Sequence, residues 1–183
     1  VKWAKKNDYN VVSPQQVETF FWNMEERSLG GRLILYKQNE NTKIVKTKPL
    51  LKKLLKNGVL SYTMYNLPKV YHGLVKRTVL DEIRQKCGGQ AVPGLSPDIC
   101  LAIAIALLYD ENVIINKPIS IAGACPSSAT RVASHKGHQG KLSDMPHLYN
   151  RPEYKWHHLV PPFYSVETTW AESALHTIAV LAD

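Results

Sequence analysis

The sequence predicts an α/β fold, with a mixed sheet flanked by helices, in a single domain or a fragment of one over residues 1–183. Three observations lead to this prediction. Short apolar runs alternate along the chain with longer segments of helical pattern. One such segment, Pro97 to Tyr109, is apolar around most of its girth, which is typical of a buried helix. The length of 183 residues, of which 44% are hydrophobic, suits one domain with its own core.

Five short, largely apolar segments are the predicted strands. They are rich in β-branched or aromatic residues and are separated by residues that favour turns. The polar run from Gln38 to Thr42 predicts one such turn. The strands are expected at Val11–Val12, Phe20–Trp22, Arg32–Tyr36, Val113–Ile115 and Ile119–Ala122.

Four helices are predicted from apolar stripes and from signals at their ends. The first has Thr47 as a candidate N-cap and Gly58 as a C-terminal stop. Its apolar stripe is Leu50, Leu51, Leu54 and Leu55. The other helices are expected over Thr78–Cys87, Pro97–Tyr109 and Thr168 to the end of the chain.

The net charge of +8 is compatible with a polyanionic partner, such as nucleic acid, an acidic membrane surface or a ligand that carries a diphosphate. Seven of the lysines lie between Lys37 and Lys56. Three of these, Lys52, Lys53 and Lys56, fall mostly off the leucine stripe of the first predicted helix. That basic run is therefore typical of the solvent face of an amphipathic helix, and charge alone identifies no partner.

Composition and motifs limit the classes of protein to consider. No apolar run approaches the roughly 20 residues of a membrane-spanning helix. The three cysteines are odd in number and not closely spaced, which favours a reducing compartment and a cytoplasmic protein. The sequence contains no GxGxxG, GxxxxGK[ST] or GxSxG motif. Because the chain begins with Val1 and ends inside a helical pattern, we expect both ends to be cuts.

Short motifs in a fixed order connect the chain to a known family. The run Leu67–Leu80 places a short strand before basic residues and a helix. Gly88-Gly89 and then Pro93–Asp98 follow, so that a Gly-rich loop leads to an acidic residue at a helix start. Together with Lys117–Gly123 and Phe20–Trp22, this pattern resembles the acceptor-side half of family-two glycosyltransferases of the GT-A type, in a branch with Ser-Pro-Asp at the acid. The resemblance spans about residues 11–174.

The resemblance implies a partial GT-A domain, which is Rossmann-like, and an activity. The activity is the inverting transfer of a sugar from a nucleotide-sugar donor to a hydroxyl of a glycan or another acceptor. Asp98 would be the general base that removes the proton of the acceptor hydroxyl. Tyr71, His72, Arg77 and Ser96 would bind substrate. From position alone, Asp98 is explained equally well as a cap of its helix, and His72 as a half-buried histidine of a strand.

The sequence lacks the nucleotide-binding half that the resemblance requires. An Asp-x-Asp motif would hold a divalent metal, Mn²⁺ or Mg²⁺, and the donor diphosphate. The Asp residues before Asp98 are Asp8 and Asp81, and neither belongs to such a motif. We therefore expect the isolated chain not to transfer sugar. In the loop after the acid, His138 follows His135 by three residues and is a candidate metal ligand, although a solvated loop explains it as well.

Other functions stay open at this point. The basic residues Arg131, Lys136 and Lys141, with aromatic neighbours, would hold nucleic acid electrostatically, although no RNP, KH or helix-turn-helix pattern accompanies them. The chain would alternatively be an inert remnant that docks to a partner through an exposed apolar patch on its sheet. The segment Cys125–Tyr164 has weak periodicity and is expected to be a long loop. Six aromatic residues in it or shortly after it would either stack on a sugar or fill a core beneath it: Tyr149, Tyr154, Trp156, Phe163, Tyr164 and Trp170.

Overall fold

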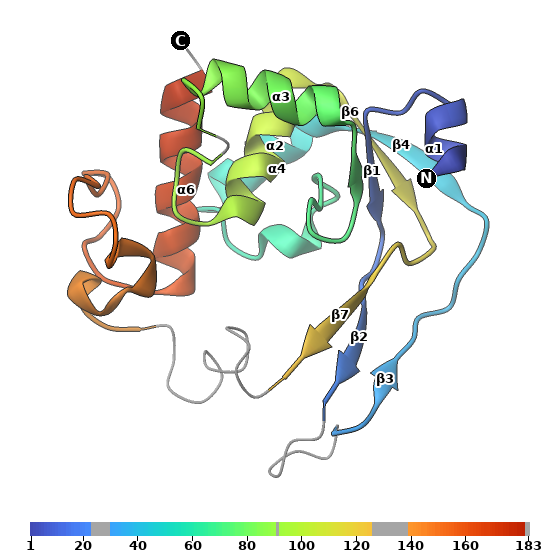
Figure 1. Ribbon diagram of the computed structural model, residues 1–183, viewed down its shortest axis with the longest axis horizontal. Helices are drawn as coiled ribbons and strands as arrows, with labels where there is room; N and C mark the ends of the chain where they lie inside the picture. The colour runs from blue at the N-terminus through green and yellow to red at the C-terminus, as the bar shows by residue number, and fades with distance from the viewer. Residues whose placement is uncertain (23–29, 91, 126–138, 182–183) are drawn as a thin grey trace.

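The computed structural model describes residues 1–22, 30–90, 92–125 and 139–181. It is a mixed α/β structure with flanking helices, as the sequence predicts, but it has two mixed sheets where the sequence predicts one. Figure 1 shows most of the helices gathered on one side and the strands on the other, with the N-terminal helix (residues 2–6) beyond the strands. Among the described residues, no helix is long and apolar enough to cross a membrane.

The first sheet has four strands in the order β4-β6-β1-β5. Its central strands β1 and β6 are parallel, with Val12 opposite Val113, whereas β4 and β5 run antiparallel to their neighbours. Val11 faces helices α3 (Arg77–Lys86) and α4 (Pro97–Leu108). Val12 packs with Ala4 of helix α1 (Lys2–Lys6) on the other face, because successive residues of a strand point to opposite sides. The strands are β1 (Val11–Pro14), β4 (Thr42–Lys46), β5 (Leu74–Val75) and β6 (Glu111–Ile115).

The second sheet has three strands in the order β3-β2-β7 and projects away from the helices (Figure 1). Strands β2 and β7 are parallel, and β3 is antiparallel to β2. Trp22 follows β2 and is 56% exposed, so the predicted strand at Phe20–Trp22 is confirmed in position but its aromatic run is not fully buried. The strands are β2 (Glu18–Phe21), β3 (Leu33–Ile34) and β7 (Ile121–Ala124).

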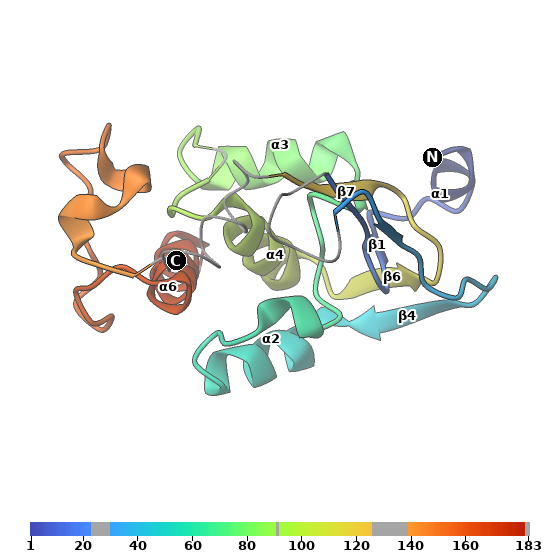
Figure 2. The same ribbon diagram turned by 90° about the horizontal axis from the view of Figure 1, so that it is seen from below.

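The four predicted helices are confirmed within two residues at their described ends, and a short helix, α1, is added at the start. Figure 2 shows α2 and α3 on opposite sides of α4. Helix α6 also packs against α4, and segment 139–164, which contains two 3₁₀ turns, lies beyond α6 (Figure 1). The helices are α1 (Lys2–Lys6), α2 (Thr47–Lys56), α3 (Arg77–Lys86), α4 (Pro97–Leu108) and α6 (Val166–Leu181).

Two local features differ from the prediction. Strand β4 is missing from it: its sequence, Thr-Lys-Ile-Val-Lys, has a single apolar pair between two lysines, and it is an edge strand, where lysine is common. Thr47 is not the N-cap of α2, since Lys46 holds that position. The Thr47 hydroxyl instead donates to the carbonyl oxygens of Ala106 and Tyr109, at 3.3 and 2.6 Å, and ties α2 to the end of α4.

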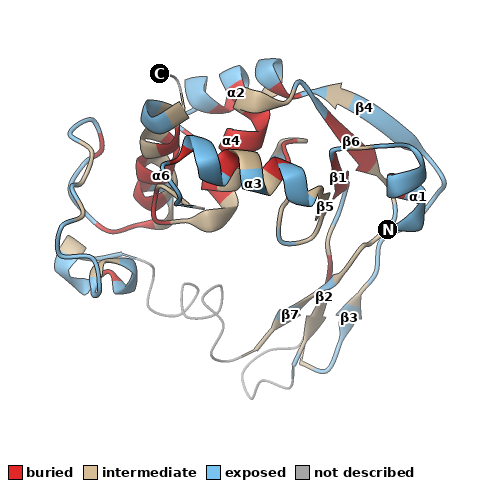
Figure 3. Cartoon of the chain, turned by 45° about the horizontal axis from the view of Figure 1, so that its top comes forward, coloured by how far each residue is buried: buried red, intermediate tan, exposed pale blue. Residues whose placement is uncertain are grey.

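Helix α4 is the centre of the core, and Figure 3 shows it buried between the other helices. One face, with Ile99 and Ile103, packs against α2 and α6. Another face, with Ile105, packs against α3 and β1. A helix that is apolar all round must be covered on all sides, and this explains why three helices and a sheet surround α4.

The packing of α2 on α4 predicts a sharp contrast between two adjacent leucines of one helix. Leu54 is fully buried and Leu55 is 36% exposed. We expect Leu54→Ala to lower the free energy of unfolding by about 2–5 kcal/mol, because it leaves a cavity, and Leu55→Ala by about 1 kcal/mol or less. Urea denaturation followed by circular dichroism measures both values. Equal losses would contradict this orientation of α2.

Candidate functional site

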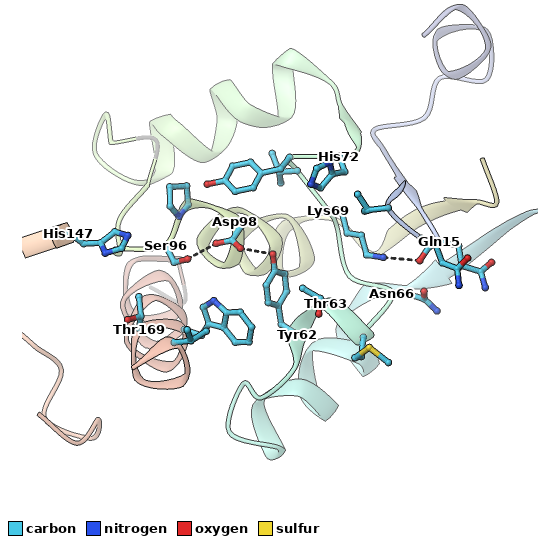
Figure 4. A pocket seen from close by; sticks show the side chains of 18 of the residues that line it. Gln15, Tyr62, Thr63, Asn66, Lys69, His72, Ser96, Asp98, His147 and Thr169 are labelled. Atoms are coloured by element: carbon cyan, nitrogen blue, oxygen red, sulfur yellow. Dashed lines mark hydrogen bonds between the residues drawn. The ribbon is translucent and has the colours of Figure 1, made fainter. Parts of the chain in front are cut away.

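A large pocket of about 1140 Å³ lies where β1 ends, between the helices and the second sheet. Six parts of the chain line it: the residues after β1, Tyr36 after β3, the segment from the 3₁₀ turn η1 (Tyr62–Met64) to the turn before β5, the start of α4, His147, and the start of α6 with the preceding Tyr164. Figure 4 shows the polar side chains that meet there. Ligands of α/β proteins bind beyond the carboxyl ends of parallel strands, so this position is a common one for a site.

Asp98 lies in the first turn of α4 and is held by two hydroxyl groups (Figure 4). The Ser96 hydroxyl donates to Asp98 Oδ1 at 2.5 Å, and the Tyr62 hydroxyl donates to Oδ2 at 2.7 Å. Ser96 occupies the N-cap position but forms no capping bond there, because its hydroxyl is turned toward Asp98. The carboxylate is thus fixed in the pocket by hydroxyl donors, an arrangement that helix capping does not require.

Of the two hydroxyl donors to Asp98, Tyr62 is the more distant in sequence, at 36 residues. Burial raises the pKa of its hydroxyl, and the negative charge of Asp98 raises it further. The hydroxyl therefore stays protonated and remains a donor to the carboxylate. Its ring stands edge-on to Trp170 of α6, with ring centroids 5.1 Å apart, so both the ring and the hydroxyl of Tyr62 are held.

The loop that carries Asp98 is fixed by α6. The Ser173 hydroxyl oxygen accepts bonds from the backbone N–H groups of Leu95 at 3.1 Å and Ser96 at 2.9 Å. Gly94 lies so close to α6 that a Cβ there would be 2.7 Å from the Ser173 Cα. Arg151 adds a bond from its Nη1 to the Gly94 carbonyl at 3.0 Å. Only glycine fits at position 94 without moving one of the two segments.

The other end of the pocket carries Lys69 and His72 (Figure 4). The Lys69 ammonium donates to the carbonyl oxygens of Pro14 at 3.2 Å and Gln15 at 3.0 Å. Burial lowers the pKa of this amine. His72 Nδ1 lies 2.9 Å from the Ser120 hydroxyl, and burial together with the charge of Lys69 lowers the pKa of the imidazole.

Four of the predicted site residues come together in this pocket: Tyr71, His72, Ser96 and Asp98. His72 lies in the turn before β5 and not in a strand, which corrects the predicted local structure. Arg77 does not line the pocket; it is exposed at the start of α3, where its Nε donates to Asp81 Oδ1 at 3.0 Å. The candidate metal ligand His138, like His135, lies outside the described residues.

The six aromatic residues named as stacking or core candidates divide into two groups. Trp170 of α6 and Tyr164 line the pocket, but Tyr164 is 7% exposed and belongs to the small core around Met145, so only Trp170 meets the requirement for sugar stacking. The others do not line it: Tyr154 and Trp156 pack against a small core around Met145, and Tyr149 and Phe163 are exposed. For Tyr154 and Trp156, the alternative of a core beneath the loop therefore holds.

Sequence reasoning missed Tyr62 and Lys69 as site residues. Tyr62 precedes Asp98 by 36 residues, and no local pattern connects the two. Lys69 is one lysine in a basic chain. Its distinguishing signal is the neighbouring Pro68, which is buried and follows the buried Leu67, so that a lysine stands directly after a core segment.

The resemblance also implies a divalent metal, and the residues in this pocket do not form a ligand set for one. Within the described ranges, no group of three or more His, Cys, Asp or Glu side chains could hold a metal ion.

Comparison with protein-family models, with curated proteins and with solved structures finds no match for this chain.

The attachment of the Asp98 loop to α6 gives one prediction. Ser173→Ala leaves two backbone N–H groups without their acceptor, so we expect a loss of about 1–3 kcal/mol in the free energy of unfolding, measured by urea denaturation. Ser143→Ala is the matched control, because that serine is exposed, and it should change stability by less than about 0.5 kcal/mol. A loss no larger than the control would mean that Ser173 does not hold the loop.

The lowered pKa of His72 predicts a pH dependence of stability. An unfolded histidine titrates near 6.5, while the folded protein resists protonation of His72, so the unfolded state binds more protons below that pH. Stability from this group is therefore complete above pH 6.5 and falls as the pH is lowered through that value. We expect His72→Asn to lose less stability than the wild type between pH 7.5 and pH 5.5, in urea titrations at each pH. An unchanged pH slope would contradict the assignment.

Proposed function

We propose that this chain is the acceptor-side part of an inverting glycosyltransferase that uses a nucleotide-sugar donor, and that the pocket binds the acceptor with Asp98 as general base. The observation that carries the proposal is the Asp98 carboxylate, oriented by Ser96 and Tyr62 at the wall of a large pocket with aromatic side chains. The resemblance of the sequence around Asp98 to the acceptor motif of the family supports it.

The geometry around Asp98 suits the removal of a proton from a hydroxyl. Each carboxylate oxygen has two acceptor positions, and one bond to each leaves room for a third hydroxyl, that of the acceptor. In the proposed reaction, Asp98 takes this proton while the acceptor oxygen forms a bond to the anomeric carbon. The bond between that carbon and the nucleoside diphosphate breaks, and the diphosphate leaves with the electron pair. Attack opposite the leaving group inverts the configuration.

The walls of the pocket suit a sugar or another ring with polar edges. Trp170 supplies aromatic surface on which the C–H face of a sugar packs, while Asn66 and Thr63 supply groups for its hydroxyls. Trp170 is held by the edge-on contact with Tyr62, so the stacking surface and the base are positioned by the same residue.

Nucleic-acid binding is the other function considered, and the described lysines favour it less. Lys46, Lys48, Lys76 and Lys117 each pair with an acidic residue, at distances from 2.5 to 2.7 Å. These pairs interrupt the positive surface on which such binding depends. Of the basic loop residues, Arg131 and Lys136 lie outside the described residues.

Docking to a partner is favoured by one observation. Trp22, Leu33 and Ile121 are exposed by 56%, 43% and 55%, and the strand registers place them on one face of the second sheet. This apolar face is the kind of surface that a further domain or subunit covers. It is compatible with the proposed function, because an acceptor-side part needs a donor-binding part.

The test uses the indole N–H signals of the four tryptophans in ¹⁵N-labelled chain. We expect a methyl glycoside from a panel of common sugars to shift the Trp170 signal at millimolar concentration, because Trp170 lines the pocket. The signals of Trp3, Trp22 and Trp156 are internal controls, since none of these residues lines it. Equal shifts of all four signals, or none for every sugar, would sink the proposal.

The role of Asp98 is tested with Asp98→Asn in a transfer assay that includes the donor-binding part. The amide keeps the size of the side chain but cannot accept a proton, so we expect kcat to fall by about 10²- to 10⁴-fold with little change in the acceptor KM. Asp144→Asn, at an exposed acid outside the pocket, is the matched control. A variant Asp98→Asn that keeps near wild-type kcat would exclude Asp98 as the base.

A further inference from the structure

Lys69 differs from the ion-paired lysines in its surroundings. It is half-buried at the wall of the pocket, and in the described part of the chain it belongs to no ion pair. Its hydrogen bonds go to the backbone carbonyls of Pro14 and Gln15. An ammonium group has three N–H donors, so two carbonyl bonds leave one donor for a ligand.

The charge of Lys69 is incompletely compensated. Taking an ammonium out of water is costly unless an opposite charge or strong acceptors replace the water. Burial lowers the pKa of the Lys69 amine, as expected where two carbonyl groups replace only part of the lost solvation by water. A negatively charged ligand group in the pocket would supply the missing opposite charge.

The segment that carries Lys69 is rigidly attached. The Lys69 backbone N–H donates to the buried Ser13 hydroxyl oxygen at 3.0 Å, and that hydroxyl donates to Asn112 Oδ1 at 3.1 Å. Asn112 Nδ2 in turn donates to the Asn66 carbonyl at 3.0 Å. A Cβ at Gly73 would lie 2.5 Å from the Lys69 carbonyl oxygen and 2.6 Å from that of Val12, so the turn is pressed onto β1. The cation is therefore in place before any ligand arrives.

Neutral polar side chains surround the cation. His72, whose Nδ1 lies 2.9 Å from the Ser120 hydroxyl, and the side chains of Gln15, Gln16 and Asn66 line the same end of the pocket. Figure 4 shows Lys69, His72, Gln15 and Asn66 at this end, and Asp98 with Ser96 and Tyr62 apart from them. A tetrahedral anion with several acceptor oxygens can accept from the ammonium and from side-chain amides at this end, whereas a carboxylate offers only two oxygens.

We infer that the Lys69 end of the pocket is a phosphate subsite, so that the ligand carries a phosphate or diphosphate at Lys69 and a hydroxyl at Asp98. The subsite stands on its own observations, while the joint description of the substrate rests on the proposed function. Either the donor diphosphate or a phosphate on the acceptor has the required chemistry.

The test is a calorimetric titration of the chain with inorganic pyrophosphate at low and moderate salt. We expect Lys69→Met to weaken binding by about 10- to 100-fold, because it removes a charged donor. Lys52→Met removes the same charge from the exposed face of α2 and should leave the affinity unchanged within about twofold. Asp98→Asn should strengthen binding, because it removes a like charge from the same pocket.

Uridine diphosphate and glucose 6-phosphate distinguish the two sources of phosphate. Tighter binding of the nucleotide than of pyrophosphate assigns the subsite to the donor, and tighter binding of the sugar phosphate assigns it to the acceptor. If Lys69→Met does not fold, amide shifts of the wild-type chain at residues 15–16 and 66–72 on adding pyrophosphate carry the test. Equal loss in the Lys69 and Lys52 variants, absence of binding, or shifts confined to other residues would overturn the inference. Sugar-induced shifts of Trp170 without pyrophosphate binding would overturn it while leaving the proposed function intact.

Discussion

The burial of helix α4 from Ile99 to Ala106 is the constraint on which the rest of the structure depends. Residues from Ile99 to Ala106 supply both large core clusters, so α2, α3, α6 and β1 must each lie against this helix. A helix enclosed in this way meets water only at its ends. Asp98, its one charged residue, accordingly stands in the first turn, at the mouth of the pocket. The same packing that builds the core thus presents a carboxylate to a ligand.

The two ends of the pocket are held by different parts of the core. At the Asp98 end, the Ser173 hydroxyl attaches the loop before α4 to α6. At the Lys69 end, the buried pair Ser13 and Asn112 attaches the turn before β5 to the central strands β1 and β6. Buried hydroxyl and amide groups that satisfy one another fix a unique geometry, because leaving any of them unpaired is costly. The pocket is therefore held at both ends by buried hydrogen bonds.

Much of this architecture follows from local sequence pattern. The leucine stripe from Leu50 to Leu55 predicts α2, and apolar residues around most of the circumference of the next segment predict α4. The Ser-Pro-Asp sequence at the start of α4 places Asp98 and Ser96 together. What cannot be predicted depends on tertiary contacts. Strand β4 exists because β6 offers it an edge, and its lysines give no sign of this. Tyr62 reaches Asp98 only because η1 and α4 pack together, and Thr47 bonds to α4 in place of its own helix.

The bond between Ser13 and Asn112 joins residues 99 positions apart, and β1 cannot find its parallel partner β6 until the intervening chain has been brought together. Closing this long loop lowers the conformational entropy of the chain before the contacts between the strands can stabilise it. Topologies rich in such contacts fold slowly. The helices can form earlier from local interactions, so the Lys69 end of the pocket is completed late. During synthesis, the chain up to α3 has a first strand with unsatisfied backbone groups on its β6 side. The Lys69 end of the pocket is therefore complete only after β6, which ends at residue 115, has joined the sheet.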